Sequence, residues 1–289
     1  MSTQSIAATE ARHYSSPAQQ AAPDAKTWIT RGANFVVAVS QASAGTVFSR
    51  DANPDEYMVY LVDAAAVIEA GNETIEAKAD SLTIVPPGAS RVTMSDAGQV
   101  VRVFSTRADD LAGAASNAAS YSAGAPEVAP LQAWPDPVGG FKLRNYQVGD
   151  YTRADSNMRI FRSTNLMMNI MTSRDAPRDV RKLSPHSHTD FEQGSLALSG
   201  DWVHHMRYPW SADMTTWKAD EHIEMSSPSL LVIPPKVIHT SRNVNSGGSA
   251  LVDVFAPPRM DFSSKPGMVC NAADYPMPAK AGEQDGCTG

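Results

Sequence analysis

Short apolar runs constrain the fold of this chain more than any other feature of its sequence. Glycine, proline, asparagine and aspartate separate the runs, and the chain has 20 prolines, so long helices have little room. Runs of this length with such boundaries are typical of strands in an all-β sandwich or barrel. The eight runs are NFVVAVS, EYMVYLV, DSLTIVP, QVVRVFS, NLMMNIM, GSLALSG, PSLLVIP and ALVDVFA.

The runs occur twice in the same order. Residues 48–63 can be laid on residues 185–200 without a gap, SLTIVPPGASR (81–91) matches SLLVIPPKVIH (229–239), and residues 100–107 resemble 251–259 with one residue inserted. Three matching segments in one order indicate a tandem duplication. The separation grows from 137 to 148 residues, so the second copy has eleven extra residues, which we place near residues 207–224. The sequence therefore predicts two similar β-barrels.

The duplication divides the chain into five regions. An N-terminal stretch without an apolar core is expected to be a flexible arm, and a segment rich in alanine, serine and glycine is expected to link the halves, with room for one short helix at 108–119. The predicted regions are the arm 1–27, a first barrel 28–107, the linker 108–140, a second barrel 141–262 and a C-terminal tail 263–289.

Charge and hydropathy limit the partners. The net charge of −7 provides no basic field for nucleic acid or an anionic membrane. No apolar run approaches the ~20 residues that span a bilayer, and the N-terminus does not resemble a secretory signal. The two cysteines, Cys270 and Cys287, do not form a disulfide framework, so a reducing cytoplasm is expected. The expected partner is a small-molecule substrate, with a homodimer left open.

Two motifs carry the chemistry. Residues 186–200, HSHTDFEQGSLALSG, hold two histidines one residue apart, and residues 234–239, PPKVIH, end on a third histidine four residues before Asn243. An HxH pair alone is weak evidence of a metal site, but a third histidine and a polar residue in register strengthen it. On a strand, residues two apart share a face, so His186 and His188 are expected to point the same way.

These motifs resemble those of the cupin superfamily, small jelly-roll barrels. Its first motif reads HxH, three or four residues, an acid or amide, six residues and glycine, which His186, His188, Gln193 and Gly200 match. Its second motif reads PxGxxHxxxN, with Lys236 here in the glycine slot, a departure that affects the turn more than the ligand. The resemblance covers residues 30–105 and 150–260. It implies an all-β bicupin, two tandem cupin jelly-roll β-barrels, the second of them metal-binding.

The expected metal ligands are His186, His188, Gln193 and His239. Imidazole nitrogens suit first-row divalent metals such as Fe, Mn, Ni, Zn or Cu. Glu192 is the alternative to Gln193, because the shorter spacing of the family motif would select it. Neighbouring residues on a strand face opposite sides, so only one of the two is expected to point at the metal. The six-residue step to Gly200 favours Gln193. Three imidazoles and an amide are all neutral, which would leave the charge of the ion uncompensated.

The first barrel is expected to lack a metal. Aligned with the ligand positions of the second copy are Ser49, Asp51, Glu56 and Arg91. An arginine cannot serve as a metal ligand, and Arg91 is expected to pair with Asp51 or Glu56 instead, with a small anionic ligand bound by Arg91 as the alternative. This barrel is predicted to be structural.

Two further residues are candidates for catalysis. A two-residue turn at Gly200-Asp201 would place Ala197 opposite His204 and Gln193 opposite Tyr208. Both side chains would then point inward, His204 as a proton carrier and Tyr208 as a hydrogen-bond donor to a bound oxygen. The alternative is that both are packed core residues.

The resemblance implies a metal-dependent enzyme. Fe(II) is favoured, as in the non-haem dioxygenases of the superfamily that cleave carbon–carbon bonds of aromatic or dicarbonyl compounds, with Mn, Ni or Zn as alternatives. The alternative functions are a non-redox lyase or isomerase acting on a sugar acid or similar molecule, in which the ion polarises a carbonyl, and a non-catalytic binding protein.

Overall fold

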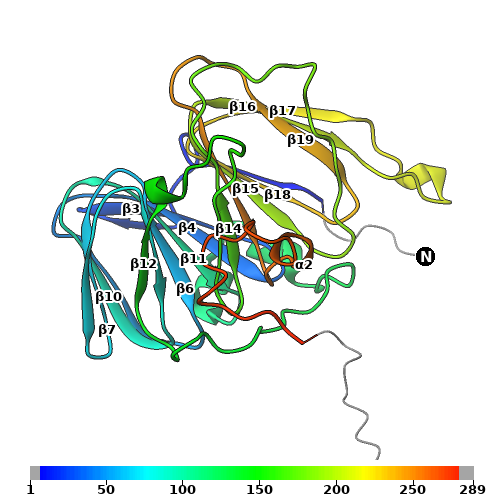
Figure 1. The fold of residues 1–289 in the computed structure, drawn as a ribbon. Helices are drawn as coiled ribbons and strands as arrows, with labels where there is room; N and C mark the ends of the chain where they lie inside the picture. Colours follow the sequence, from blue (N-terminus) through cyan, green and yellow to red (C-terminus); the bar gives the residue numbers. More distant parts are fainter. Residues whose placement is uncertain (1–6, 280–289) are drawn as a thin grey trace, which may run out of the picture.

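The computed structural model describes residues 7–279 and contains two β-barrels, each made of two sheets (Figure 1). The first barrel combines a seven-stranded sheet, β12-β9-β6-β11-β4-β3-β2, with a four-stranded sheet, β5-β10-β7-β8. Its strands are β2 (Gln20–Ala22), β3 (Ala25–Arg31), β4 (Phe35–Ala42), β5 (Val47–Asn53), β6 (Tyr57–Leu61), β7 (Ala66–Ala70), β8 (Glu73–Ala77), β9 (Ser81–Val85), β10 (Gly88–Met94), β11 (Gly98–Ser105) and β12 (Arg144–Gln147).

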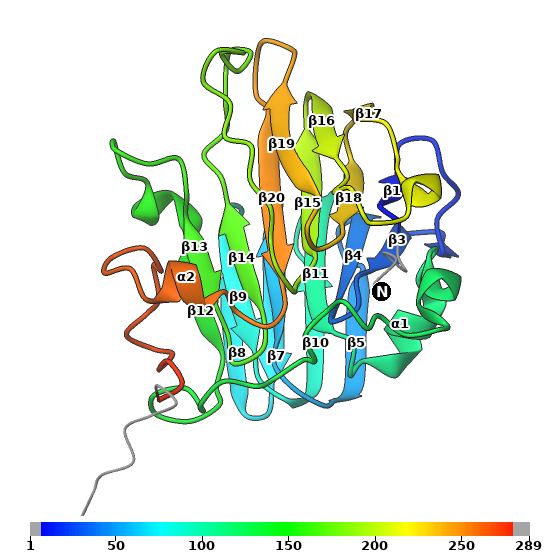
Figure 2. The ribbon, with the colours of Figure 1, turned by 90° about the vertical axis from the view of Figure 1, so that its right-hand side faces the viewer.

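The second barrel repeats this plan with a six-stranded sheet, β1-β18-β15-β20-β14-β13, and a three-stranded sheet, β17-β16-β19. Figure 2 shows the strands of both barrels running in roughly the same direction. Its strands are β1 (Thr9–Arg12), β13 (Ile160–Arg162), β14 (Met167–Ile170), β15 (Gln193–Ser199), β16 (Asp201–Arg207), β17 (Glu221–Ser226), β18 (Ser229–Ile233), β19 (Ile238–Asn243) and β20 (Ala250–Phe255). The predicted all-β bicupin architecture is confirmed.

The two large sheets pack against each other and form the core between the barrels. This apolar layer includes Phe35 and Val103 from the first half and Leu196 and Val254 from the second. Figure 1 shows the large sheets in the middle and the small sheets outside them. Strands such as β6 and β18 are therefore buried on both faces, which explains why their sequences are continuous apolar runs instead of alternating ones.

The halves exchange edge strands. Strand β1, near the N-terminus, pairs with β18 of the second barrel, and β12 pairs with β9 of the first. The prediction of a flexible arm over 1–27 is therefore wrong from residue 9 onward. The predicted boundary at 141 is also wrong, because it assigns β12 to the second barrel, whereas β12 pairs with the first. A sheet edge exposes unpaired backbone groups, and each exchanged strand pairs with one such edge.

The connecting and terminal segments contain little regular secondary structure. The linker contains α1 (Asp109–Ala114) and a 3-10 helix, η1 (Ala118–Tyr121), where the sequence left room for one helix. Two further 3-10 helices, η2 (Val148–Tyr151) and η3 (Met214–Thr216), and α2 (Met260–Ser263) complete the elements. Within residues 7–279, no helix combines the length and apolar character needed to cross a bilayer. Cys287 and the end of the predicted tail lie outside the described residues.

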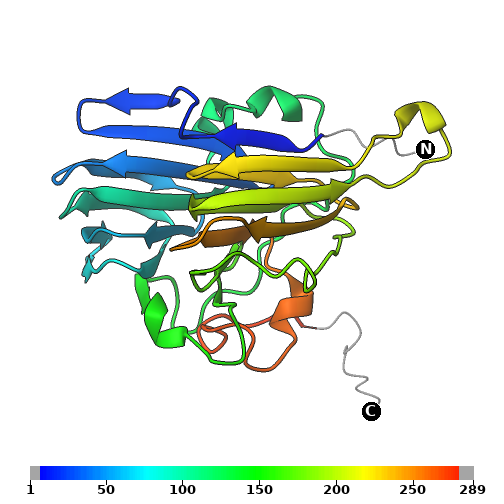
Figure 3. The ribbon, with the colours of Figure 1, turned by 90° about the horizontal axis from the view of Figure 1, so that it is seen from above.

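Strand pairing supports the duplication. Arg91 pairs with Ser49 in the first half, as His239 pairs with His186 in the second. The eleven extra residues lie where they were expected: the β16–β17 connection has thirteen residues (208–220), whereas the β7–β8 connection has two (71–72). Figure 3 shows this longer connection projecting from the barrel.

The ungapped alignment is wrong by one residue between β5 and β6. Tyr57 lies opposite Val85, and Gln193 lies opposite Ile233, which is the matching position of the second copy. The counterpart of Gln193 is therefore Tyr57, and that of Glu192 is Glu56.

Candidate metal centre

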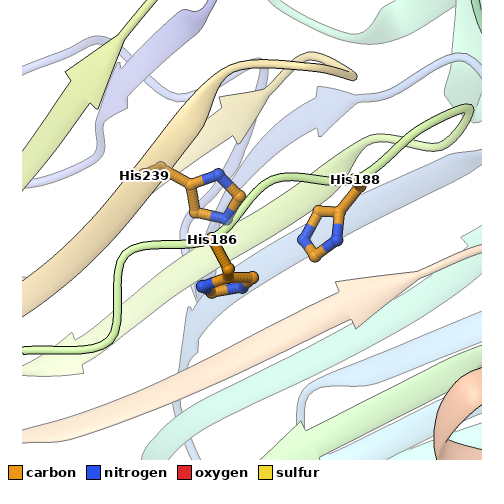
Figure 4. Close-up of side chains that lie close together, drawn as sticks. All are labelled: His186, His188 and His239. Carbon is orange, nitrogen blue, oxygen red and sulfur yellow. The ribbon is translucent and has the colours of Figure 1, made fainter.

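Three histidines converge at one end of the second barrel. His239 is near the start of β19, whereas His186 and His188 lie on an irregular segment before β15, not on the strand that their spacing predicted. A pair of backbone hydrogen bonds, 2.8 and 3.1 Å long, joins His186 to His239. Figure 4 shows the three rings turned toward one another, and one ligand nitrogen from each lies within 4.8 Å of the others.

Gln193 completes this cluster. Its Oε1 lies 2.9 Å from Nε2 of His188 and 3.2 Å from Nε2 of His239. Its Nε2 donates to Oδ1 of Asp253 at 2.9 Å, which fixes the orientation of the amide. Glu192 points elsewhere: its carboxylate accepts from the backbone N–H of Ala33 and from the Tyr121 hydroxyl. The structure thus brings together His186, His188, Gln193 and His239, and separates Glu192 from them.

The hydrogen bonds of the rings fit a metal ion. Nδ1 of His186 faces the carbonyl of Ser184, and Nδ1 of His239 faces the carbonyl of Val237, both at 2.9 Å. A carbonyl only accepts, so each Nδ1 carries the proton, and Nε2 of the neutral ring presents a lone pair. Nε2 of His239 and Oε1 of Gln193 are then two acceptors facing each other, an arrangement that a cation between them would relieve.

Burial keeps the rings of His188 and His239 neutral. It lowers the pKa of His188 to about 3 and the pKa of His239 to about 4. Both rings are therefore unprotonated at neutral pH, as metal coordination requires. Burial also raises the pKa of Asp253 to about 6, although hydrogen bonds from Asn169 and Gln193 oppose this shift. Asp253 is hydrogen-bonded directly to Gln193 of the cluster.

The turn before His239 adopts a strained conformation. Lys236, which occupies the glycine slot of the second motif, has a φ of 67°. Its backbone N–H donates to the carbonyl of His188, so the turn also holds the first motif in place. A left-handed conformation costs a residue with a Cβ about 1–3 kcal/mol. As predicted, the departure from glycine affects the turn and leaves His239 in position.

A cavity of about 180 Å³ lies beside the cluster. Its volume is below the ~300 Å³ at which typical ligand pockets begin, so it suits a small metabolite. Residues of the cluster, Asp253, three arginines and several amide, hydroxyl and apolar side chains form its wall. The lining residues are Asn157, Met158, Asn169, Met171, Arg174, Arg178, Ser184, His186, Gln193, Trp202, His239, Thr240, Ser241, Leu251, Asp253, Arg259 and Phe262.

The predicted hairpin after Gln193 does not form. Strand β15 pairs with β18 and β20, and β16 pairs with β17 and β19 in the other sheet. The chain changes sheets at Gly200, which has a φ of 83° and approaches Ser249 so closely that a Cβ would lie 2.6 Å from its Oγ. Tyr208 is therefore not opposite Gln193.

Neither predicted catalytic side chain lines the cavity. Tyr208 donates to Glu221 and packs with Met206 in a separate apolar cluster. His204 does lie on the same face of its sheet as His239, as predicted, but it is 1% exposed and its Nδ1 bonds to Ser241 at 2.7 Å. Burial lowers the pKa of His204 to about 4. Both are packed residues, so the catalytic roles predicted for them lose their geometric basis.

Three of the aligned positions of the first barrel, Ser49, Asp51 and Arg91, line one surface pocket, and Glu56 is not among its lining residues. Ser49, Asp51 and Arg91 are exposed, and the side chain of Arg91 makes no hydrogen bond or ion pair with any residue in 7–279. Its expected pairing with Asp51 or Glu56 is wrong, because Glu56 is fully buried and accepts from Thr164 and Tyr275. That this barrel holds no metal remains a prediction.

Sequence reasoning missed the polar wall of the cavity. The sequence did contain a signal for Asp253, because this acid interrupts the apolar run ALVDVFA. It stands at the position that Arg102 occupies in the first copy. Arg174 and Arg178 lie on a segment without regular structure, so no periodicity marked them.

Comparison with solved structures identifies the same two-barrel fold in several proteins. AerE from Microcystis aeruginosa is 7% identical, with a TM-score of 0.55 over 83% of this chain and 95% of that one. A variant of oxalate decarboxylase from Bacillus subtilis is 10% identical, with a TM-score of 0.58 over 85% and 76%. The 7S globulin of Momordica charantia is 12% identical, with a TM-score of 0.55 over 86% and 84%.

No protein-family model matches the sequence, and neither does any curated protein. The chain thus has the cupin fold of these neighbours, and its histidine cluster is of the kind that could hold a metal ion.

The role of Gln193 can be tested against that of its neighbour. Replacing Gln193 with leucine should weaken metal binding about 10- to 100-fold or more, because a change of even a supporting group has an effect of that size. Glu192→Gln should leave metal affinity unchanged, since Glu192 faces Ala33 and Tyr121. Competition with a chromogenic chelator measures both affinities. Equal affinities in the two variants would exclude Gln193 as a ligand.

Proposed function

We propose that this protein is a metal-dependent cupin enzyme that holds one divalent transition metal ion through His186, His188, Gln193 and His239. The observation that carries the proposal is the pair of facing acceptors, Oε1 of Gln193 and Nε2 of His239, both of them buried and in a cluster with two further histidines. Fe(II) is the favoured ion and a non-haem dioxygenase the favoured activity, with a small aromatic or dicarbonyl metabolite as the substrate.

The chain itself supplies binding and orientation. When bound, Fe(II) would supply coordination positions for both substrate and oxygen. The small cavity limits the substrate to a few carbon atoms or one ring, and Trp202, Met171 and Phe262 offer it apolar contacts. Asn157 and Asn169 offer amide groups that can orient its oxygen atoms. Asp253 holds the amide of Gln193 with its oxygen toward the histidines.

The wall of the cavity favours oxygen chemistry over proton transfer. A lyase or isomerase needs a base beside the substrate. Among the described residues that line the cavity, Asp253 is the only carboxylate, and it already accepts from Gln193 and Asn169. His204, the predicted proton carrier, and Tyr208, the predicted hydrogen-bond donor, lie outside this wall. A non-redox lyase or isomerase, using Mn, Ni or Zn, is therefore the second candidate.

Oxygen dependence distinguishes the two activities. The protein loaded with Fe(II) under anaerobic conditions should bind nitric oxide, an oxygen surrogate, and give the EPR signal of a ferrous nitrosyl. Candidate chelating substrates should then be consumed only when oxygen is admitted, with matching oxygen uptake. A His188→Ala variant serves as the control and should show neither effect. Full turnover under strict anaerobiosis would exclude the dioxygenase and leave the lyase or isomerase.

A further inference from the structure

The cavity beside the candidate metal centre is positively charged before any metal binds. Its wall contains three arginines, Arg174, Arg178 and Arg259, and only one acid, Asp253. Three positive charges therefore face at most one negative charge. This surplus contrasts with the chain as a whole, whose net charge is −7. A divalent ion would add to it, so the site as a whole attracts anions.

The three arginines differ in how far the surrounding residues balance their positive charge. Arg259 forms two hydrogen bonds to Asp261 and lies 3.8 Å from the centre of the Phe262 ring, so its charge is already matched. Arg178 donates only to uncharged groups: the carbonyls of Ser241 and Lys182 and the hydroxyl of Ser184. Arg174 makes no side-chain hydrogen bond or ion pair within residues 7–279.

Arg174 and Arg178 are also close enough to repel each other. Burial lowers the pKa of Arg178, and the positive charge of Arg174 lowers it further. Two like charges without a carboxylate partner raise the free energy of the unliganded protein, and an anion bound between them would relieve that repulsion. A carboxylate suits this role, because it accepts two hydrogen bonds from one guanidinium.

The segment that carries these arginines is held in place. Backbone hydrogen bonds in both directions join Arg174 to Ser249, and the Asn243 side chain donates to the carbonyl of Ala176 at 2.8 Å. The backbone N–H of Arg178 donates to the carbonyl of Asn243. The asparagine that ends the second motif thus anchors the arginine segment to β19. Because the backbone of this segment is already anchored, it loses little conformational freedom when the arginines bind a ligand.

We propose that Arg174 and Arg178 bind a carboxylate of the substrate, and that the substrate is a small acid with a second anionic or chelating group for the metal ion. The part of this proposal in which a second group of the substrate binds the metal ion rests on the proposed function. The part in which a carboxylate binds the arginine pair does not. The substrate class is therefore a small dicarboxylate that also carries a hydroxyl or oxo group next to one carboxylate. The cavity volume limits it to a few carbons.

Matched acids test the proposal by calorimetry on the protein loaded with Zn(II), which is redox-inert. Malate and 2-hydroxyglutarate carry a distal carboxylate, whereas 2-hydroxybutyrate and 2-hydroxypentanoate carry a methyl group in its place. At least one dianion should bind tenfold or more tightly than its methyl counterpart. Arg174→Gln and Arg178→Gln should each remove most of this preference, because a charged hydrogen bond is lost. Arg181→Gln is the matched control: Arg181 is on the same segment, 84% exposed and paired with Asp179.

Metal content and thermal unfolding, measured on the same samples, separate the two proposals. Zinc binding without a preference for either dianion overturns the arginine assignment and leaves the metal centre intact. The same result follows if the preference survives in Arg174→Gln and Arg178→Gln. If zinc does not bind, the proposed function fails, and the arginine pair is then judged on the metal-free protein. On the metal-free protein, the dianions should bind less tightly than on the zinc-loaded protein, but still more tightly to the wild type than to Arg174→Gln. Equal binding to these two proteins overturns the arginine assignment.

Discussion

A His186→Ala/His188→Ala variant should purify as a folded protein that retains less than about a tenth of the metal bound per wild-type chain. The variant loses two of four ligands, and change of even one supporting group costs about 10- to 100-fold in affinity. The fold should survive because neither histidine lies in a strand and because backbone atoms make the hydrogen bonds that join residue 186 to His239. Elemental analysis of the purified protein measures the metal content.

The control for this experiment removes the other pair of neighbouring histidines. His205 and His222 face each other across β16 and β17, with their Nδ1 atoms 2.8 Å apart, and both lie outside the candidate centre. A His205→Ala/His222→Ala variant should keep its full metal content of one ion per chain. Undiminished metal in the folded His186→Ala/His188→Ala protein would refute the assignment, as would loss of metal only in the control.

A Glu56→Ala variant should lose about 3 kcal/mol or more of the free energy of unfolding. Glu56 is fully buried where the barrels meet, and its carboxylate accepts from the backbone N–H and hydroxyl of Thr164 and from the Tyr275 hydroxyl. Each buried donor left without a partner costs about 1–3 kcal/mol. Urea unfolding monitored by tryptophan fluorescence measures the loss.

Two companion variants show whether this loss comes from the buried contacts. Glu56→Gln keeps an acceptor oxygen and should lose less stability, whereas Glu76→Ala removes an exposed carboxylate of the same barrel and should change little. All three proteins should bind the same amount of metal per folded chain, because Glu56 belongs to the junction and not to the metal centre. A Glu56→Ala protein as stable as Glu76→Ala would show that these contacts do not hold the halves together.

The strand runs, the duplication and the three histidines could be predicted from the sequence, because each depends on residues close together in the chain or on repeated spacing. A strand buried on both faces must be apolar throughout, so β6 and β18 are visible as continuous runs. The two histidine motifs remain in register because the Arg91–Ser49 pairing of the first copy recurs as His239–His186. The position of the eleven extra residues followed from counting alone.

The tertiary structure decided which neighbours these local features meet. A glycine at residue 200 is compatible with a hairpin and with a change of sheet, and only the packing of the two sheets places Tyr208 away from Gln193. The exchange of β1 and β12 depends on sheet edges that are distant in sequence.

The same is true of the wall of the cavity. Asp253 reaches Gln193 across 60 residues, and Arg178 reaches the carbonyl of Ser241 across 63. Contacts between segments so distant leave no periodic pattern in the sequence, since they are selected by the free energy of the whole packed core and not by local propensity. The sequence by itself therefore determined which side chains could meet in the candidate centre, and the folded chain determined the groups that surround them.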